Sequence, residues 1–345
     1  MITSYIKPYI RKLTPYASAR DSYQSGILLD ANENAFGSVL TNLREAYNRY
    51  PDPGSNELKK ALALFVRTAP DRIAAGNGSD EIIELLIKIF AGPGEEIIVC
   101  EPTYGMYQAA ANAFNIAVKT CLLTDNFQLN LKAIEQQTSK KTRIIFCCSP
   151  NNPTGNLLNE NDIKKLCAMF GGPVIVDEAY IEFSKKESLA KLGAQFDNLI
   201  ILRTLSKAWG LAGLRVGYAV ADPSVVRYID RIKLPYNINR VSAGLAIQAL
   251  SNTEQLRKLC SNIIDERERL AQQLKNLGVS VFPSNANFLL VRCPGARSVV
   301  RRLAEESGII IRDMSDKPLL ADCFRITVGT PKENKKLIQA LKNLL

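Results

Sequence analysis

Four short apolar runs, each followed at once by polar residues, most constrain how this chain can fold. They are EEIIVCEP, TRIIFCCSPNNPTG, PVIVDEAY and NLIILRTLSK, and a fifth run, RVGYAVAD, comes next. Unbroken apolar runs of this length are typical of strands that are buried on both faces, as in parallel sheets. Residues 79–91, SDEIIELLIKIFA, have the amphipathic spacing of a helix. We therefore predict an α/β fold with a mostly parallel sheet.

The order of these patterns divides the 345 residues into three parts. We expect an N-terminal arm at residues 1–30, a large α/β domain at 31–255 and a smaller α+β domain at 256–345. The small domain is predicted from a helical segment at about 253–277 and from the strand-like segments VSVFPSNANFLLVRC, GIIIRDM and CFRITVGT. A chain of this length is too long for a single ordinary core.

The net charge of +10 favours an anionic partner. The distribution of the basic residues indicates whether that partner is a small molecule or a nucleic acid. Basic residues are spread along the chain in short pairs such as Lys140-Lys141 and Lys335-Lys336, which are typical of solvated faces. No aromatic and basic recognition motif accompanies them, so we expect small anionic metabolites and no nucleic acid. No stretch approaches the roughly 20 apolar residues of a membrane span, so we expect no membrane partner.

The cysteines indicate the cellular compartment, and the absence of histidine limits the possible catalytic mechanisms. Eight cysteines occur without a ligand-like spacing, several inside apolar runs, and MITSYIKPYIRKLTPY has lysines and prolines where a secretory signal would be apolar. We therefore expect reduced thiols and a cytoplasmic protein. The sequence contains no histidine, which excludes serine-histidine and cysteine-histidine hydrolases and histidine-ligated metal sites. We expect no metal.

Ligands of open α/β sheets bind beyond the carboxyl ends of the strands, so the polar residues there are the candidate site. The segments concerned are Gly76–Asp80, Glu101–Tyr104, Ser149–Gly155, Asp177–Tyr180 and Thr204–Lys207. Gathered at one edge, they would offer an anion-binding turn, an aromatic ring, an amide, a carboxylate, a phenol and an amine.

The glycine-rich turn GNGSD at the start of a helix has two interpretations. It is either a simple turn with an N-cap or a phosphate cradle, since glycines allow close backbone approach and the helix N-terminus favours anions. Ser206 and Arg215 can add a hydroxyl and a guanidinium to the same phosphate. These additions favour the cradle.

Asp177 and Lys207 each have a structural and a functional interpretation. Asp177 ends a buried strand and needs a cationic partner, either a neighbouring Arg or Lys or the protonated ring nitrogen of a bound heterocycle. Lys207 is either a solvent-exposed lysine after a strand or a nucleophilic amine whose pKa is lowered by its surroundings. A reactive lysine, a ring-nitrogen carboxylate and a phosphate cup together are what pyridoxal phosphate requires.

These motifs resemble a known family. GNGSDEII, EPTYGMY, SPNNPTG, VDEAY, RTLSKAWGLAGLRVG and FRITVGTP occur in the order and spacing of the fold-type I pyridoxal-phosphate aminotransferases. LTPY, LDANENAFG and RYPDP make the chain similar to the histidinol-phosphate aminotransferase branch, and the resemblance covers nearly the whole chain.

The resemblance implies a role for each matching residue. Lys207 would bond covalently to the cofactor, and Asp177 would hold the ring nitrogen in its protonated form. Asn152 and Tyr180 would contact the phenolic oxygen of the ring, on which Tyr104 would stack. The residues around the cofactor phosphate would be Gly78, Ser79, Asp80, Ser206 and Arg215.

The resemblance also implies the substrates and the assembly. Tyr50 would reach the phosphate in a partner subunit, which implies a homodimer. Arg325 would bind the anionic end of the substrate, helped by Arg312 and Tyr16. The implied reaction moves the amino group between histidinol phosphate and 2-oxoglutarate, giving imidazole-acetol phosphate and glutamate in histidine biosynthesis. The alternatives within the same chemistry are a threonine-phosphate decarboxylase and an aromatic amino acid aminotransferase.

Overall fold

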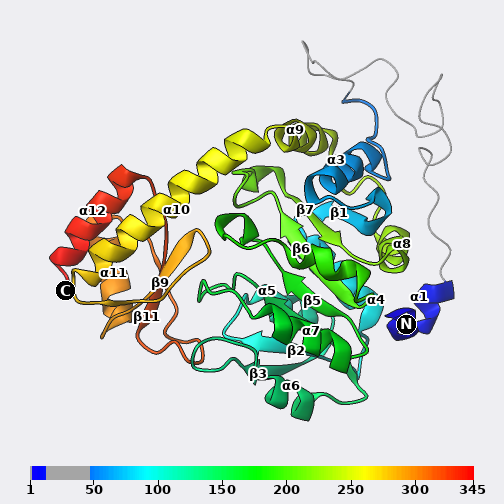
Figure 1. Ribbon diagram of the computed structural model, residues 1–345, viewed down its shortest axis with the longest axis horizontal. Coiled ribbons are helices and arrows are strands. Elements are labelled where there is room, and N and C mark those ends of the chain that lie inside the picture. The colour runs from blue at the N-terminus through cyan, green and yellow to red at the C-terminus, as the bar shows by residue number, and fades with distance from the viewer. Residues whose placement is uncertain (1, 13–46) are drawn as a thin grey trace.

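The structure is a computed structural model that describes residues 2–12 and 47–345 (Figure 1). Its α-helices within these residues are α1 (Pro8–Lys12), α3 (Asn56–Val66), α4 (Ser79–Phe90), α5 (Met106–Ala113), α6 (Leu131–Gln137), α7 (Glu160–Met169), α8 (Pro223–Ile232), α9 (Arg240–Leu250), α10 (Thr253–Lys275), α11 (Ala296–Ser307) and α12 (Pro331–Lys342). No helix of the described ranges is long and apolar enough to cross a membrane.

A seven-stranded sheet forms the centre of the larger body, in the order β1-β7-β6-β5-β4-β2-β3. Its strands are β1 (Ile73–Asn77), β2 (Glu96–Glu101), β3 (Ala117–Leu122), β4 (Thr142–Cys148), β5 (Val174–Asp177), β6 (Leu199–Thr204) and β7 (Val216–Val220). Neighbouring strands from β3 to β6 pair in parallel, whereas β7 is antiparallel to both β1 and β6. The predicted mostly parallel α/β sheet is confirmed.

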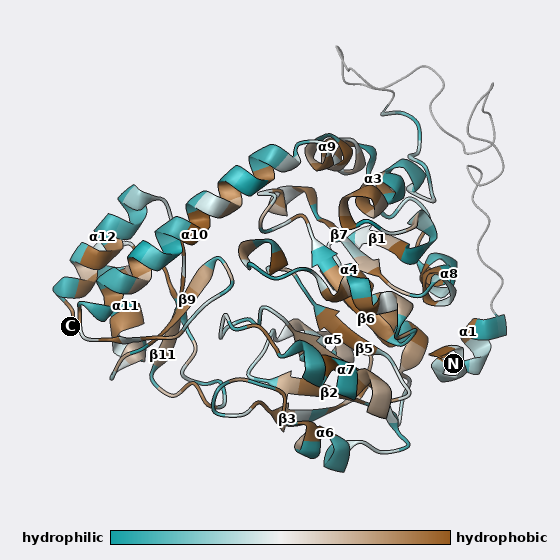
Figure 2. Ribbon diagram, viewed as in Figure 1, coloured by the Kyte–Doolittle hydropathy of each residue, from teal (hydrophilic) through white to brown (hydrophobic). Residues whose placement is uncertain are grey.

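Both faces of this sheet are buried, which explains the unbroken apolar runs. In β6, Ile200 and Leu202 pack in one core with α4, α5 and α8, while Leu199 and Ile201 pack in the opposite core with α3 and α7. Successive side chains of a strand point to opposite faces, so a strand covered on both sides must be apolar at every position. Figure 2 shows these central strands as the hydrophobic interior between helices of mixed colour.

A second, antiparallel sheet lies at the other end of α10, in the order β10-β11-β9-β8 (Figure 1). Its strands are β8 (Ser280–Val281), β9 (Phe288–Arg292), β10 (Arg312–Asp313) and β11 (Cys323–Thr327). Leu289, Val291 and Phe324 of this sheet share a core with helices α10, α11 and α12, whereas Phe288 and Leu290 join the core of the large sheet. The two sheets are therefore connected through continuous packing.

The strand segments differ in detail from those expected. VSVFPSNANFLLVRC is not one strand but two, β8 and β9, because Pro283 lacks a backbone donor and the chain turns back there. Only Arg312 and Asp313 of GIIIRDM pair with a neighbour. The edge strands β1 and β3 were not predicted, since β1 reads IAAGN and β3 reads AVKTCL, in which five of the six residues are exposed or half-buried.

The large sheet collects the candidate residues at one edge. The carboxyl ends of β1, β2, β4, β5 and β6 lie there, and antiparallel β7 begins at the same edge, because Val216 pairs with Asn77 and Gly217 with Thr204. Arg215, the residue before β7, therefore lies at this edge too. The close approach of the start of α4 to β7 depends on Gly217, where an added Cβ would lie 2.2 Å from the backbone nitrogen of Ser79.

We predict that Gly217→Ala destabilises the fold by about 2–3 kcal/mol, because its methyl group has no room against backbone atoms that cannot rotate away. Gly213→Ala is the matched control, since a Cβ there meets nothing within 4 Å, and it should change stability by less than about 1 kcal/mol. Urea unfolding of the cofactor-free proteins measures both. Equal losses in the two variants would contradict the assigned packing.

Candidate active site

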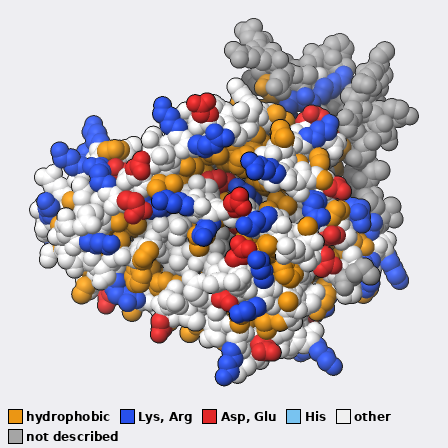
Figure 3. Space-filling model, in the orientation of Figure 1, with side chains coloured by type: hydrophobic (Ala, Val, Ile, Leu, Met, Phe, Trp, Pro, Cys, Tyr) orange, Lys and Arg blue, Asp and Glu red, His pale blue; other side chains and the backbone are white. Residues whose placement is uncertain are grey.

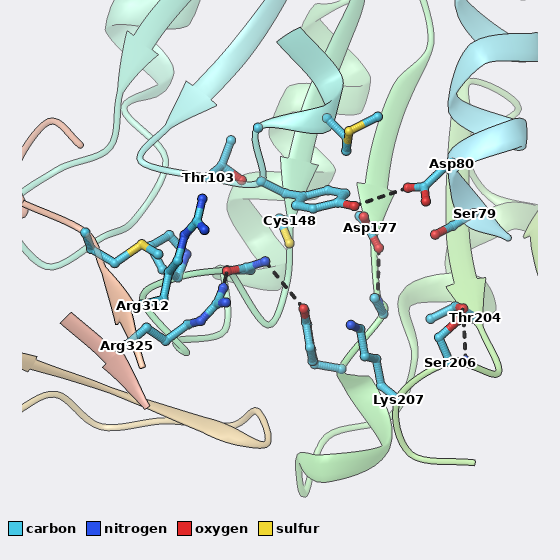
Figure 4. Close-up of a pocket in the computed structure, with 18 of the residues that line it drawn as sticks. Ser79, Asp80, Thr103, Cys148, Asp177, Thr204, Ser206, Lys207, Arg312 and Arg325 are labelled. Atoms are coloured by element: carbon cyan, nitrogen blue, oxygen red, sulfur yellow. Dashed lines mark hydrogen bonds between the residues drawn. The ribbon is translucent and has the colours of Figure 1, made fainter. Parts of the chain in front are cut away.

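One cavity of about 530 Å³ at the carboxyl edge of the large sheet holds most of the candidate residues. The candidates that line it are Ser79, Asp80, Tyr104, Asn152, Asp177, Tyr180, Ser206, Lys207, Arg215, Arg312 and Arg325. Figure 4 shows Ser79, Asp80 and Ser206 at one end, Arg312 and Arg325 at the other, and Asp177 and Lys207 between them. Residues from both sheets therefore form a single site.

Asp177 is a buried carboxylate held by neutral donors. Tyr107 donates its hydroxyl to Oδ2 at 2.8 Å, and the backbone amide of Ala179 donates to Oδ1 at 3.0 Å. Burial raises the pKa of Asp177 to about 6, while these two hydrogen bonds act in the opposite direction. The neighbouring cation Arg203 is not its partner, because Arg203 pairs with Glu182 at 2.7 Å. Asp177 therefore faces the cavity with no cation bound to it among the described residues.

Lys207 follows β6 and extends its amine into the open cavity (Figure 4). Among the residues that the structure describes, its Nζ has no hydrogen-bond partner, and it lies 5.8 Å from the centroid of the Tyr180 ring. The surrounding protein removes water from the amine, and this desolvation, followed by the charge of Arg325, lowers its pKa. An amine with a lowered pKa is a better nucleophile and base near neutral pH.

The glycine-rich turn forms an anion-binding end of the cavity. Gly78 is the N-cap of α4 with a φ of 82°, a left-handed region that favours glycine, and it supplies no side chain to cap the first amides of the helix. The hydroxyls of Ser79 and Ser206 line the same end. The exposed helix N-terminus and these hydroxyls suit a phosphate.

Arg215 and Asp80 pair with each other at this end. Arg215 donates to Asp80 Oδ2 at 3.1 Å, and Tyr104 donates its hydroxyl to Asp80 Oδ1 at 3.2 Å. The side chain of Asp80 thus orients both neighbours. Arg215 lies against Gly78, where an added Cβ would come within 2.5 Å of its guanidinium. The guanidinium therefore stays beside the helix N-terminus.

An amide, a phenol and an aromatic ring surround the middle of the cavity. Asn152 Nδ2 donates to the Tyr180 hydroxyl at 3.4 Å, and both side chains are buried. The ring of Tyr104 packs edge-on against Tyr107, with centroids 5.6 Å apart. Burial, and then Asp80, raise the pKa of Tyr104, which therefore acts as a neutral ring. These groups can hold a planar heterocycle between them.

Two arginines form the opposite end of the cavity. Arg312 of β10 and Arg325 of β11 are direct neighbours across the antiparallel pair. Arg325 donates to the carboxamide oxygen of Asn152, and neither arginine has a carboxylate within ion-pair distance among the described residues. Burial, together with the charge of Arg312, lowers the pKa of Arg325. Two adjacent guanidiniums without a counterion form a site for an anion.

The remaining candidate residues lie elsewhere. Gly78 borders the cavity through the turn but does not line it, and Tyr50 lies outside it, stacked on Tyr236 with ring centroids 4.5 Å apart. Tyr16 lies outside the residues that the structure describes. No cluster of three or more potential metal-ligating side chains is found in residues 2–12 and 47–345.

Sequence reasoning missed several residues of the site, above all Tyr107. Its ring is fully buried and stacked on Phe146 with centroids 4.8 Å apart, so its hydroxyl is held against Asp177. The signal was present in EPTYGMY, since Tyr107 follows Tyr104 by three residues at the start of a helix and thus lies on the same face. Other cavity residues outside the predicted segments are Gly105, Met106, Cys148, Met314 and Lys317.

The arrangement fits pyridoxal phosphate. Among residues 2–12 and 47–345, no cation pairs with the carboxylate of Asp177 and no group hydrogen-bonds to the amine of Lys207, and the start of α4 with two hydroxyls can hold a phosphate. These three groups match the ring nitrogen, the aldehyde and the phosphate of that cofactor.

Sequence comparison identifies relatives along almost the whole chain. The pattern of the family described as aminotransferase class I and II matches residues 24–341. A histidinol-phosphate aminotransferase of Parabacteroides distasonis is 40% identical over 344 residues, which are 98% of this chain and 97% of the relative. The histidinol-phosphate aminotransferase of Bacteroides fragilis is 42% identical and covers 97% of both chains.

Solved structures show the same fold. The histidinol-phosphate aminotransferase of Sinorhizobium meliloti in complex with pyridoxal 5'-phosphate superimposes with a TM-score of 0.82 and 26% identity over 91% of this chain and 89% of that one. The L-threonine-O-3-phosphate decarboxylase of Porphyromonas gingivalis has a TM-score of 0.72 and 25% identity over 86% and 91% of the two chains. The chain therefore belongs to the class I and II aminotransferases, as a pyridoxal-phosphate-dependent transaminase of fold type I.

Proposed function

We propose that this chain is a histidinol-phosphate aminotransferase that transfers the amino group between L-histidinol phosphate and 2-oxoglutarate. The observation that carries the proposal is the pair of adjacent arginines, Arg312 and Arg325, which have no carboxylate partner among the described residues and lie in the same cavity as Lys207. They provide a binding site for an anionic substrate group. Relatives of about 40% identity that bear this name, aligned over nearly their whole length, support the choice of substrate.

Lys207 performs the proton transfer in this proposal. When bound, pyridoxal phosphate supplies an aldehyde that bonds to amines and a protonated ring that takes up the negative charge of the reacting carbon. In the resting enzyme Lys207 would hold the aldehyde carbon through Nζ, and once the substrate amine had displaced it, the free amine would accept the proton that leaves the substrate's α-carbon. Its lowered pKa supports this role, because a base must be neutral before it can accept a proton.

Asp177 keeps the ring nitrogen protonated. Its carboxylate is buried and faces the cavity, so an opposing cation stabilises its ionised form. Tyr107 and the amide of Ala179 donate to its two oxygens and hold the carboxylate plane in place. Asn152 and Tyr180 bind the phenolic oxygen of the ring, and Tyr104 covers one face.

The cofactor phosphate binds at the start of α4 in this proposal. Its ligands are Gly78, Ser79, Asp80, Ser206 and Arg215, and the free amides of the first turn add to the hydroxyls and the guanidinium. Asp80 orients Arg215 through the ion pair at 3.1 Å. The bound phosphate thereby fixes one end of the cofactor.

Arg325 and Arg312 bind the anionic end of either substrate, with Tyr16 as a further ligand. A planar guanidinium binds a phosphate or a carboxylate through two parallel hydrogen bonds. The same pair therefore serves the phosphate of histidinol phosphate and a carboxylate of 2-oxoglutarate. The sequence contains no histidine, so tyrosine, asparagine or backbone groups recognise the imidazole.

The active unit in this proposal is a homodimer, in which Tyr50 reaches the phosphate of the partner's cofactor. Tyr50 is 49% exposed, and exposed apolar side chains lie nearby on two helices that pack together, Leu64 on α3 and Val241 and Leu245 on α9. Such a surface is suited to a second copy of the chain.

The domain division and the compartment are also part of the proposal. In this proposal residues 1–30 are an arm, residues 31–255 a large domain and residues 256–345 a small domain. The two sheets, one on each side of α10, support the division between the large and the small domain. A cytoplasmic location is supported by eight cysteines that are all buried and free. Lysines and arginines are interspersed with acidic residues over the visible face, which favours small-molecule partners over nucleic acid (Figure 3).

A substrate panel tests the proposed function. The enzyme should form glutamate from 2-oxoglutarate with histidinol phosphate as the amino donor, with a kcat/KM at least about 10-fold above that for aromatic amino acids. Lys207→Ala is the control and should lose at least about 1,000-fold in turnover together with the visible absorbance of the cofactor-lysine bond. Release of CO2 from threonine phosphate without glutamate formation would instead establish the decarboxylase.

Arg325→Ala tests the shared anion site. Loss of a charge-assisted, two-point hydrogen bond should raise KM about 100-fold for histidinol phosphate and for 2-oxoglutarate alike. Arg301→Ala, on the exposed side of α11, is the surface control and should leave both values unchanged. Steady-state kinetics with each substrate varied in turn measures the effect. A change confined to one substrate would show that the two anions bind at different places.

Asp177→Asn tests the ionisation of the buried carboxyl. The folded-state pKa of about 6 lies above the ordinary value of 3.8, so the carboxyl destabilises the cofactor-free fold increasingly as pH rises from 4 to 6 and fully above that. The variant's extra stability should therefore grow by about 2–3 kcal/mol between pH 4 and pH 8, while its turnover falls. Urea unfolding at both pH values measures this. An advantage that is constant with pH would refute the raised pKa.

A further inference from the structure

Residues 312–322, which are β10 and the segment that leads from it to β11, form a thin wall of the catalytic cavity. Arg312, Met314 and Lys317 line the catalytic cavity on one side and a second cavity of about 480 Å³ on the other. The segment is internally rigid, because the Met314 amide donates to the Cys323 carbonyl at 2.9 Å and the Lys317 amide donates to the Met314 carbonyl at 3.0 Å. The segment is therefore bonded to the small sheet through β11.

An ion pair connects this wall to the large sheet. Lys317 Nζ lies 3.2 and 3.3 Å from the two carboxylate oxygens of Glu101, the last residue of β2. The side chain of Glu101 is only 7% exposed and that of Lys317 is 33% exposed. A cation stabilises an ionised carboxylate that is so deeply buried, and Lys317 is the only cation that pairs with Glu101 in the described part of the chain.

The Glu101 end of this pair belongs to the loop that carries Tyr104. Glu101 Oε2 accepts the Thr103 amide at 2.8 Å, and the Thr103 hydroxyl donates to Asn151 Oδ1 at 2.9 Å. Asn151 in turn donates to the Pro102 carbonyl at 2.8 Å. The loop next to Tyr104 is thus held as one network with the turn that contains Asn152.

A second contact joins the small sheet to this network, but ligands compete for it. Arg325 donates to Asn152, yet the proposed function commits Arg325 to the substrate anion and Asn152 to the cofactor. Lys317 and Glu101 neutralise each other's charge, and the proposed function assigns neither of them to the substrate or to the cofactor. Of these two contacts, the ion pair is the one that can persist when the cavity is filled.

We propose that Lys317 and Glu101 form an ionic clasp that holds the wall at residues 312–322 over the substrate end of the cavity. The clasp places Arg312 and Met314 of the wall opposite the loop that carries Tyr104. Both members are positioning residues, since they act through these neighbours. The identity of the substrate in this inference rests on the proposed function. The position of the wall does not depend on it.

Kinetics of four variants tests the clasp. Lys317→Met should raise KM for both substrates about 10-fold, with kcat and pyridoxal phosphate affinity within about 2-fold of wild type. Glu101→Gln keeps the shape and should raise KM less, because it leaves no buried charge unpaired. The double variant should be no worse than Lys317→Met, and Lys317→Arg should stay within about 3-fold of wild type.

The opposite end of β2 supplies the matched control. Lys119 pairs with Glu96, the first residue of β2, at 2.8 Å, with exposures of 34% and 10% that resemble those of the clasp. Lys119→Met should leave KM for both substrates within about 2-fold of wild type, because that pair lies away from the cavity. An equal rise in KM for Lys119→Met would assign the effect to general destabilisation and overturn the proposal.

Hydrogen exchange of the cofactor-loaded protein provides a readout that needs no substrate. Amides of residues 103–106, 314–317 and 319–320 should exchange at least about 5-fold faster in Lys317→Met or Glu101→Gln, and at the wild-type rate in Lys119→Met. Unchanged exchange in both clasp variants, or single effects on KM that multiply in the double variant, would overturn the clasp. If wild type does not transaminate histidinol phosphate but exchange changes as stated, the proposed function fails and the clasp stands.

Discussion

The catalytic cavity depends on one buried carboxylate, Asp177, at the end of β5. Removing a carboxylate from water is costly, and within the part of the chain that the structure describes two neutral donors, the Tyr107 hydroxyl and the Ala179 amide, offset the cost. Its raised pKa of about 6 reflects that incomplete compensation. Incomplete stabilisation of the Asp177 carboxylate suits a cofactor site, because a protonated heterocycle supplies the missing cation when it binds.

The parallel sheet brings the other groups to the same carboxylate. Asp177 and Lys207 follow adjacent strands, β5 and β6, which are parallel and in register. Parallel strands end at a common edge, so residues far apart in the chain meet there. Antiparallel β7 adds Arg215 from the opposite direction, and Gly217 lets the start of α4 approach closely. The phosphate end and the reacting end of the site thus share one rigid frame.

The small sheet supplies a different kind of group, two guanidiniums without counterions. Arg312 and Arg325 come from adjacent antiparallel strands, which is why residues 13 positions apart act as a pair. Burial, together with the neighbouring charge of Arg312, lowers the pKa of Arg325. The substrate end is therefore poised for an anion, while the Lys317–Glu101 pair lies beside it as a neutral contact between the two sheets.

Apolar runs and strand-end motifs predicted β2, β4, β5, β6 and β7, the helix α4 and the long helix α10. The edge strands β1 and β3 escaped prediction because edge positions need neither continuous apolar residues nor strong β-formers. The site was predicted in outline, since Asp177, Lys207 and the GNGSD turn have distinctive local sequences. The roles assigned to individual residues, Tyr16 and Tyr50 among them, stay predictions.

The sequence by itself determined the fold class, the family and the chemical groups at each strand end, because these follow from local pattern and motif. Only the tertiary structure decided which groups touch: that Tyr107 supports Asp177, that Asp80 binds Arg215 through its side chain, and that Lys317 meets Glu101 across 216 positions of the chain. Contacts of this kind have no local signature. They depend on how the two sheets pack against each other. The side chains that meet between the sheets come from segments far apart in the sequence, and the spacing of residues along the chain does not predict which of them touch.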